Sequence, residues 1–348
     1  MSAMRDNHLA QDLTSKDILL RRRALSKAIT LVESSRIDHR QRGDELLDEL
    51  FPKAGSSFRI GITGPPGSGK STLVDAMGLM LIEQGHQVAV LCVDPSSNLS
   101  DGCVLADKTR MHRLACSDNA YIRPSAGSAG YGGVAQQTRA AIRLCEAAAY
   151  DFVVVETVGV GQNECAVAAM TDMVLLLQGP TPGDDLQVIK KGIYEHVDLV
   201  VVNKVDLARA AALKAQRRIA SALRLTRYGA RHVSPHLQPT PRVCTVSAVT
   251  GDGLSTLMNS ITLYQQEEAR NIAGRRMIQD KTWLEESIGS QALSKIKADE
   301  YLRTMFNALV DLVHAGRRAP PAAARQLLAL VSEHPESFAP RGQNGATA

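Results

Sequence analysis

Short apolar runs alternate with longer amphipathic segments through the middle of the chain. Six of these runs are nearly continuous in Val, Ile and Leu, which is typical of strands covered on both faces of a parallel sheet. Segments with helical spacing lie between them, so the pattern predicts an α/β fold with a mostly parallel sheet and helices on both faces. The six predicted strands are Phe58–Thr63, Val88–Val93, Phe152–Glu156, Met173–Leu177, Leu199–Asn203 and Val243–Val246.

Both ends of the chain carry helical rather than strand patterns. Apolar residues recur at helical spacing before the first strand, and the arginine triplet 21–23 between them predicts a solvated helix face. After residue 266 the strand runs stop, and Tyr301, Met305, Leu309 and Leu312 form a stripe that a small helical extension cannot bury alone. This stripe predicts a packing partner, for which a second copy of the chain is the natural candidate.

These patterns divide the chain into four zones. We expect an N-terminal helical extension over 1–57, an α/β domain over 58–266, a C-terminal helical dimerisation region over 267–334 and a disordered tail over 335–348. The tail is rich in Pro, Gly and small polar residues, which do not bury enough apolar surface to offset the entropy of ordering.

Bulk composition narrows the function classes. The 348 residues include 40 basic and 36 acidic side chains, and the net charge of +4 is too small to indicate nucleic-acid binding. Six cysteines without a C-x-x-C pair favour reduced packing residues and a cytoplasmic location. No targeting segment and no apolar run of membrane-spanning length is apparent, so we expect no membrane partner.

The segment that follows the first predicted strand, GPPGSGKS, is a Walker A phosphate-binding loop in its required context. Its glycines let backbone N–H groups approach phosphate oxygens, and the next helix adds its positive N-terminal end. Lys70 would reach the β- and γ-phosphates, and the Ser71 hydroxyl would bind Mg²⁺. The loop predicts a P-loop NTPase whose nucleotide contacts are Gly64, Pro65, Pro66, Gly67, Ser68, Gly69, Lys70, Ser71 and Thr72.

A second motif indicates which base is bound. Asn203, Lys204 and Asp206 form N-K-x-D at the end of an apolar run. A carboxylate accepts from the N1–H and N2–H of guanine together, whereas adenine has no matching donors. The motif therefore predicts guanine specificity, and Ser247, Ala248 and Val249 after the last predicted strand complete the base pocket.

Three segments between these motifs could sense the γ-phosphate. Asp94 and Asp107 frame the first, where strand-end carboxylates face either Mg²⁺ or ordinary cap and turn partners. The second runs from Glu156 through Gly159 to Gln162, and the Gly159 N–H could turn toward a γ-phosphate. The third is a charged loop over 179–191, which by itself is typical of a surface loop.

This ordered set of motifs resembles the MeaB/MMAA GTPases, also labelled ArgK, over roughly residues 15–330. The resemblance implies a homodimeric SIMIBI-class GTPase that chaperones an adenosylcobalamin-dependent acyl-CoA mutase, chiefly methylmalonyl-CoA mutase. It implies gating of cobalamin delivery, protection of the mutase and removal of damaged cofactor. The motifs that carry it are the Walker A loop, VDPSS (93–97), DKTRM (107–111), IRP (122–124), ETVGVGQ (156–162), GDDLQ (183–187), KKG (190–192) and NKVD (203–206).

The resemblance also implies roles for particular residues. Mg²⁺ would be held through Ser71, with Asp94, Asp107 and Glu156 contributing directly or through water. The 179–191 loop would be an extra switch that couples the nucleotide state to the mutase. GTP, GDP and Mg²⁺ are the expected ligands, and Lys70, Asp94, Glu156 and Gln162 are the candidate catalytic residues.

Some positions depart from the family pattern. The segment 98–106 lacks the usual glycine-rich sequence, and changes occur at 127–133, at Asn163 and at Val188. These changes leave the nucleotide chemistry intact but could adapt the protein to a mutase that acts on isobutyryl, ethylmalonyl or hydroxyisobutyryl thioesters.

Hydrolysis is expected to be slow without the mutase, since no arginine finger or Ras-like catalytic glutamine can be assigned. Arg110 is near a candidate switch segment in the sequence, but this alone does not make it an arginine finger.

Two alternative functions belong to other classes of protein. A nickel-insertion GTPase would need clustered Cys or His ligands, and His232, His236, Cys103 and His112 do not form such a pattern. A protein kinase acting on amino-acid transport proteins is suggested by the ArgK label, but kinase signatures are missing.

Overall fold

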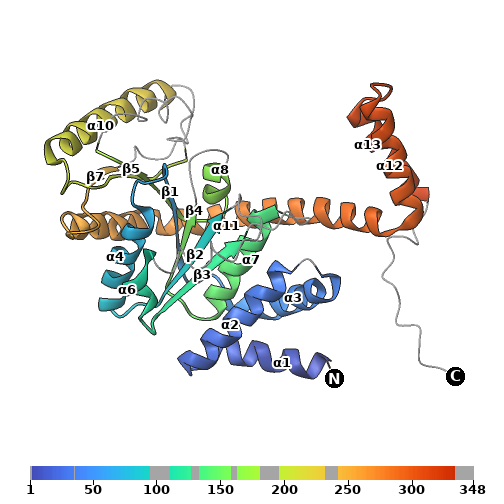
Figure 1. Cartoon of the computed structure of the whole chain (residues 1–348), viewed down its shortest axis with the longest axis horizontal. Helices are drawn as coiled ribbons and strands as arrows, with labels where there is room; N and C mark the ends of the chain where they lie inside the picture. The colour runs from blue at the N-terminus through green and yellow to red at the C-terminus, as the bar shows by residue number, and fades with distance from the viewer. Residues whose placement is uncertain are drawn as a thin grey trace. The chain divides into compact units, whose positions relative to one another are not determined.

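The computed structural model describes residues 2–34, 36–94, 110–126, 133–157, 163–180, 196–231 and 242–333. The chain forms two compact units, Met1–Asp280 and Lys281–Ala348, which are described separately. Figure 1 shows the elements in chain order. None of the helices within these ranges combines the length and apolar character that crossing a membrane requires.

The first unit begins with three helices, α1 (Ser2–Leu13), α2 (Ile18–Glu33) and α3 (Ile37–Leu50), followed by the short η1 (Phe51–Lys53). Asp17 caps α2, because its carboxylate accepts from the backbone N–H groups of Leu19 and Leu20.

The arginine triplet of α2 is not wholly solvated, so that prediction was wrong for one of its members. Arg21 is buried and donates to the side-chain oxygen of Gln87, the residue before β2, whereas Arg23 is exposed. Helical spacing turns successive residues to different faces, so one arginine of a triplet points toward the sheet.

A single parallel sheet forms the centre of this unit, in the order β3-β2-β4-β1-β5-β6-β7. The predicted parallel sheet is confirmed, and each of the six predicted strands is present to within one residue at each end. β3 was missed, because Arg123 and Pro124 interrupt its apolar pattern; proline is tolerated there since β3 is an edge strand. The strands are β1 (Phe58–Thr63), β2 (Val88–Asp94), β3 (Ala120–Ala126), β4 (Phe152–Thr157), β5 (Met173–Gln178), β6 (Leu199–Val202) and β7 (Arg242–Thr245).

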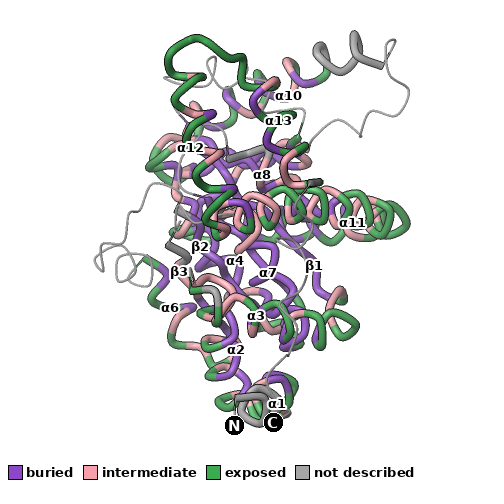
Figure 2. The backbone as a smooth tube through the Cα atoms, turned by 90° about the vertical axis from the view of Figure 1, so that its right-hand side faces the viewer, coloured by how far each residue is buried: buried purple, intermediate pink, exposed green. Residues whose placement is uncertain are grey.

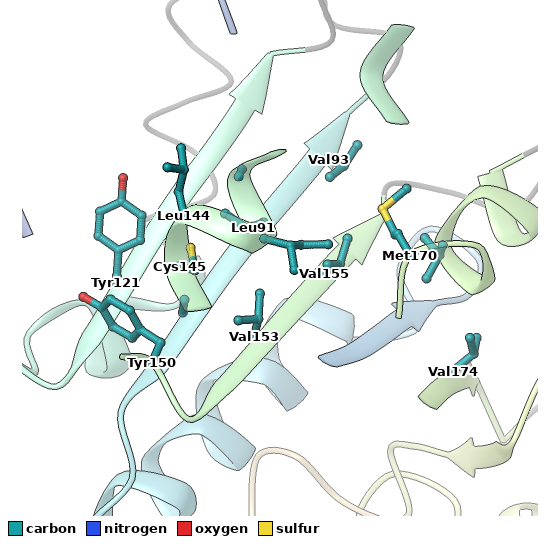
Figure 3. Packing of buried hydrophobic residues seen from close by; sticks show 14 of the residues in the cluster. Leu91, Val93, Tyr121, Leu144, Cys145, Tyr150, Val153, Val155, Met170 and Val174 are labelled. Atoms are coloured by element: carbon teal, nitrogen blue, oxygen red, sulfur yellow. The ribbon is translucent and has the colours of Figure 1, made fainter. Parts of the chain in front are cut away.

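Helices cover both faces of this sheet, as the sequence predicts. Side chains alternate along each strand, so Val153 and Val155 enter one core while Val154 enters the other. Figure 3 shows the first core, where Val153 and Val155 lie near Leu91, and Figure 2 shows that the central strands are buried. The first core is covered by α7 (Gly133–Ala147), α8 (Asn163–Ala168) and α10 (Arg209–Arg231), with α2 and α3 packed against α7; the second is covered by α4 (Lys70–Glu83), α6 (His112–Ala115) and the start of α11 (Leu254–Ala298).

Buried ion pairs attach α11 to the end of the sheet at which the strands begin. Arg276 Nε donates to Asp172 Oδ1 at 2.8 Å, and the other oxygen of Asp172 accepts the backbone N–H of Arg59 at 2.8 Å. The Arg59 guanidinium in turn pairs with Glu146 of α7 at 2.7 Å. Because these groups are buried, breaking one pair would leave an uncompensated charge. The network therefore fixes α7, α11 and two strands relative to one another.

The second unit contains the end of α11 together with α12 (Glu300–His314) and α13 (Pro320–Glu333). The predicted helix over the 301–312 stripe is confirmed, but the stripe divides. Met305 and Leu309 pack in a small core with α13, whereas Tyr301 and Leu312 remain exposed. Residue 266, where we expected the α/β domain to end, lies inside α11, and the predicted tail 335–348 lies outside the described residues.

Candidate functional site

The Walker A loop joins the carboxyl end of β1 to the first turn of α4. Its backbone has a positive φ at three glycines, 150° at Gly64, 77° at Gly67 and 92° at Gly69, a conformation that favours glycine. A Cβ atom on Gly64 would collide with the Leu177 carbonyl of β5, and one on Gly69 would collide with the Asn203 side chain. The loop thus closes tightly on its neighbours and ends at the N-terminus of α4, where the first N–H groups of a helix can bind an anion.

Lys70, the first residue of α4, is held within this loop. Its Nζ donates to the Gly64 carbonyl at 2.8 Å and to the Pro65 carbonyl at 3.1 Å. Burial lowers the pKa of the Lys70 ammonium, and the charge of Glu156 opposes that shift. Arg110 lies near enough for its charge to lower the same pKa further, a proximity that the sequence did not reveal.

Ser71 and Glu156 form the part of the predicted metal site that the structure describes. Ser71 Oγ donates to Glu156 Oε1 at 2.8 Å, and Glu156 is buried at the end of β4, beside β1. A hydroxyl and a carboxylate oxygen at this separation have the chemistry that Mg²⁺ prefers.

Of the other residues predicted to bind Mg²⁺ or to sense the γ-phosphate, the structure describes only Asp94. Asp94 ends β2, and β2 pairs with β4 so that Cys92 lies opposite Glu156; the Asp94 backbone therefore ends at the same sheet edge. Asp107, Gly159 and Gln162 lie outside the described residues, and their predicted roles stay predictions.

Asn203 links the Walker A loop, here called the phosphate loop (residues 64–69), to the loop between β7 and α11, here called the base loop (residues 246–253). Its Nδ2 donates to the Ser68 carbonyl at 2.9 Å, and its Oδ1 accepts the Ala248 backbone N–H at 3.1 Å. The side chain is buried, with 2% of its surface exposed. Asn203 stays a predicted nucleotide contact; each end of its amide also makes one hydrogen bond to the protein, which the sequence did not reveal.

Asp206 is the predicted base reader. Its carboxylate is exposed, and Oδ1 accepts a hydrogen bond from the Ser247 hydroxyl. Ser247 Oγ also accepts the Thr250 backbone N–H at 3.1 Å, so the hydroxyl has a fixed orientation. Lys204 adopts φ 64°, which helps the chain turn sharply between β6 and Asp206. Val249 is 76% exposed in the same base loop.

The described residues contain no group of three or more His, Cys, Asp or Glu side chains placed to hold a metal ion. Of the residues considered for nickel, His112 is described, whereas Cys103, His232 and His236 lie outside the described ranges.

Known proteins resemble this chain over most of its length. Residues 25–301 match the profile of a family described as methylmalonyl Co-A mutase-associated GTPase MeaB. A protein of Mycobacterium tuberculosis named "Probable GTPase" is 44% identical over 89% of this chain and 92% of its own length. The mouse protein "Methylmalonic aciduria type A homolog, mitochondrial" is 40% identical over 90% of this chain and 77% of its own length.

A solved structure is also similar. The crystal structure of a protein named LAO/AO transport system kinase is 32% identical, with a TM-score of 0.68 over 94% of this chain and 97% of that chain. The similarity extends through nearly the whole of both chains, so it includes the terminal helices as well as the P-loop fold.

Replacing Asn203 with Ala removes both hydrogen bonds that join the loops. Each unsatisfied buried group costs about 1–3 kcal/mol, so we expect affinity for GTP and GDP to fall together by about tenfold or more. The preference for GTP over ATP should not change, because Asp206, the predicted base reader, remains. Competition against a fluorescent guanine nucleotide measures both quantities.

Two variants sharpen this test. Asp206→Asn should reduce the preference for GTP over ATP, and Asn271→Ala, an exposed asparagine in α11, should change neither quantity. Unaltered nucleotide affinity in Asn203→Ala would show that the amide does not hold the two loops in their binding geometry.

Proposed function

The chain belongs to the family of methylmalonyl-CoA mutase-associated GTPases, and on that premise we propose that GTP binding and hydrolysis by this protein gate cobalamin delivery to an adenosylcobalamin-dependent acyl-CoA mutase. The same cycle would protect or reactivate that mutase. The observation that carries the proposal is the convergence of Lys70, Glu156 and Asp206 at the carboxyl ends of β1, β4 and β6, where parallel sheets bind ligands.

Binding of GTP would use three parts of this edge. The Walker A backbone would hold the phosphates, Lys70 would offset their negative charge, and the Asp206 carboxylate would accept from the guanine N–H groups. Ser247 supports the last step, because its hydrogen bond orients the carboxylate before any base arrives.

Magnesium would be held by Ser71 and Glu156, whose oxygens fit a hard cation, with Asp94 and Asp107 as further proposed ligands. When bound, it would neutralise charge on the phosphates. Glu156 holds the Ser71 hydroxyl in place, so the same carboxylate serves both the loop and the metal site. Gly159 and Gln162 follow β4 directly, and we propose that they respond to the γ-phosphate and position the attacking water.

The partner is the finer part of the proposal. The family description associates it with methylmalonyl-CoA mutase, and the relative from mouse carries the name of a methylmalonic aciduria protein. We propose that the 179–191 loop couples the nucleotide state to the mutase, and that this protein works in the cytoplasm. Burial raises the pKa of the Cys145 thiol and that of Cys244, to about 12 for the latter, as expected of inert cysteines in a reducing compartment.

The proposed cycle is tested by GTP turnover with and without the purified mutase of the same organism. We expect slow release of phosphate from the protein alone and faster release with the mutase, because ordering of the switches would position water. Lys70→Ala should abolish turnover in both conditions while the protein remains folded, since it removes the cation of the phosphate loop. Lys281→Ala, an exposed lysine outside the site, is the matched control.

Equal turnover with and without mutase would contradict the coupling, and full turnover by Lys70→Ala would contradict the assigned role. The kinase alternative, which the name of the similar solved protein raises, has its own signature: γ-labelled phosphate would appear on an acceptor protein rather than as free phosphate.

We also propose that the protein is a homodimer formed through the helical region 267–334. The support is a pair of large apolar side chains about one helical turn apart on α11: Leu284 is 61% exposed and Ile288 is 60% exposed. Exposed apolar side chains that gather on one element mark interaction sites.

Leu284→Glu combined with Ile288→Glu should place charges in this interface and yield monomers in sedimentation velocity. Leu263→Glu, a partly exposed leucine of the same helix outside the proposed region, should leave the dimer intact. A wild-type protein that sediments as a monomer at micromolar concentration would refute the dimer.

A further inference from the structure

Helix α10 has an unusual distribution of charge. Its sequence, RAAALKAQRRIASALRLTRYGAR, contains seven arginine or lysine residues and no aspartate or glutamate. The whole chain has nearly balanced charge, with 40 basic and 36 acidic residues. This one helix therefore concentrates positive charge that the composition of the chain does not reveal.

One side of the described part of α10 packs against the sheet. Ala212, Ala215, Ile219 and Leu223 are buried in the core against the sheet, and α10 contacts β6 and β7. In Figure 1 the helix lies beside β7, at the end of the strand order. Gln216 fixes this position, since its side chain donates to the Val243 carbonyl at 2.9 Å.

The cations lie on the opposite side of the helix. At 3.6 residues per turn, Lys214, Arg217, Arg218 and Arg224 fall within a sector of about 120°, directed away from the four buried residues. They extend for about 15 Å along the helix axis at a rise of 1.5 Å per residue. All four of these residues are exposed. We call them the cationic face.

The cationic face has no counter-charge in the described parts of the chain. None of its four side chains makes a hydrogen bond or an ion pair with a described residue; Arg209, at the start of α10, has a single 3.5 Å contact with Asp252, and both of those side chains are exposed. Like charges three and four residues apart destabilise a helix. Acidic groups from outside would remove that repulsion.

We propose that the cationic face docks an acidic surface of a protein partner. The proposal rests on the proposed function, since the partner meant is the mutase. Arginine suits carboxylates because its planar guanidinium donates two parallel hydrogen bonds, and an exposed stripe of this length fits within a protein interface of ordinary size.

Two other polyanions fit the helix less well. An anionic membrane is bound by helices whose apolar face inserts, but Ala212, Ala215, Ile219 and Leu223 of α10 are buried against the sheet. Among the described side chains of this helix, Leu213 is the one large apolar group that is exposed. Single-stranded nucleic acid is held by basic grooves, whereas the cationic face is the outer side of one helix and the whole chain has a net charge of only +4.

The first residue of α10 connects the cationic face to the loops that contain Asp206 and Ser247. Arg209 begins α10 three residues after Asp206, and Asp252, which contacts Arg209, accepts the Ser247 backbone N–H through its carbonyl. A partner held on α10 thus contacts the helix that directly follows the loop containing Asp206.

The test is a charge reversal, Lys214→Glu with Arg217→Glu and Arg218→Glu, in the full-length protein. The matched control reverses the same kinds of residue elsewhere: Lys16→Glu with Arg23→Glu and Arg113→Glu, all exposed. Biolayer interferometry with the mutase of the same organism should show association about tenfold slower for the α10 variant, with weaker salt dependence. The control should bind as the wild type does, and all three proteins should bind GTP equally.

A neutral variant, Lys214→Gln with Arg217→Gln and Arg218→Gln, controls for misfolding caused by the charge reversal. Its association rate with the mutase should lie between that of the wild type and that of the reversed variant. Unchanged association in both α10 variants, or equal loss in the control, would overturn the docking surface.

A different result would show that the proposed function, rather than the docking surface, is wrong. If the wild-type protein does not bind the mutase, the partner assignment fails and the surface is then tested with a short oligo-glutamate peptide, a short DNA duplex and phosphatidylglycerol vesicles. Binding of the peptide that is lost only in the α10 variants supports the acidic protein surface. Tighter binding of DNA or vesicles, or binding of none of the three, overturns it.

Discussion

The pair of hydrogen bonds made by the Asn203 amide is the constraint on which the site depends. Through it, the Ser68 carbonyl of the phosphate loop and the Ala248 amide of the base loop share one buried side chain. The two loops come from opposite ends of the α/β domain sequence, yet neither can move without breaking a bond in the interior. A ligand that spans both loops therefore meets a preorganised site, which reduces the entropy lost on binding.

The sheet supplies the frame for this constraint. All of its strand pairs are parallel, so the loops after β1, β4, β6 and β7 lie at the same end of the sheet, where the strands end. The opposite edge carries the buried charges of Arg59, Asp172 and Arg276, which attach α11 where the strands begin. One edge is thus arranged for a ligand and the other for stability, and α11 continues from the fixed edge into the second unit.

The sequence was sufficient for most of the fold because the central strands are buried on both faces and read as plain apolar runs. β3 was not predicted because an edge strand tolerates Arg123 and Pro124, which interrupt its apolar pattern. The prediction for Arg21 was wrong because a triplet of arginines does not show which member faces the sheet. The family resemblance is confirmed by the match over residues 25–301.

The site was predictable at the level of motifs but not of contacts. Glycine spacing identified the phosphate loop, and the structure adds why Gly64 and Gly69 cannot carry a side chain. The N-K-x-D pattern could not show that Asn203 binds the protein itself, because its partners lie far away in sequence. The cationic face of α10 was hidden for a related reason: the net charge of +4 averages over the whole chain.

Isothermal titration calorimetry of the purified protein with GTP, GDP and ATP in magnesium buffer tests the central claim most directly. The joined loops and the oriented Asp206 carboxylate predict saturable heat with both guanine nucleotides and far weaker binding of ATP. Absence of heat with GTP and GDP on well-folded protein, or equal affinity for ATP, would contradict the account.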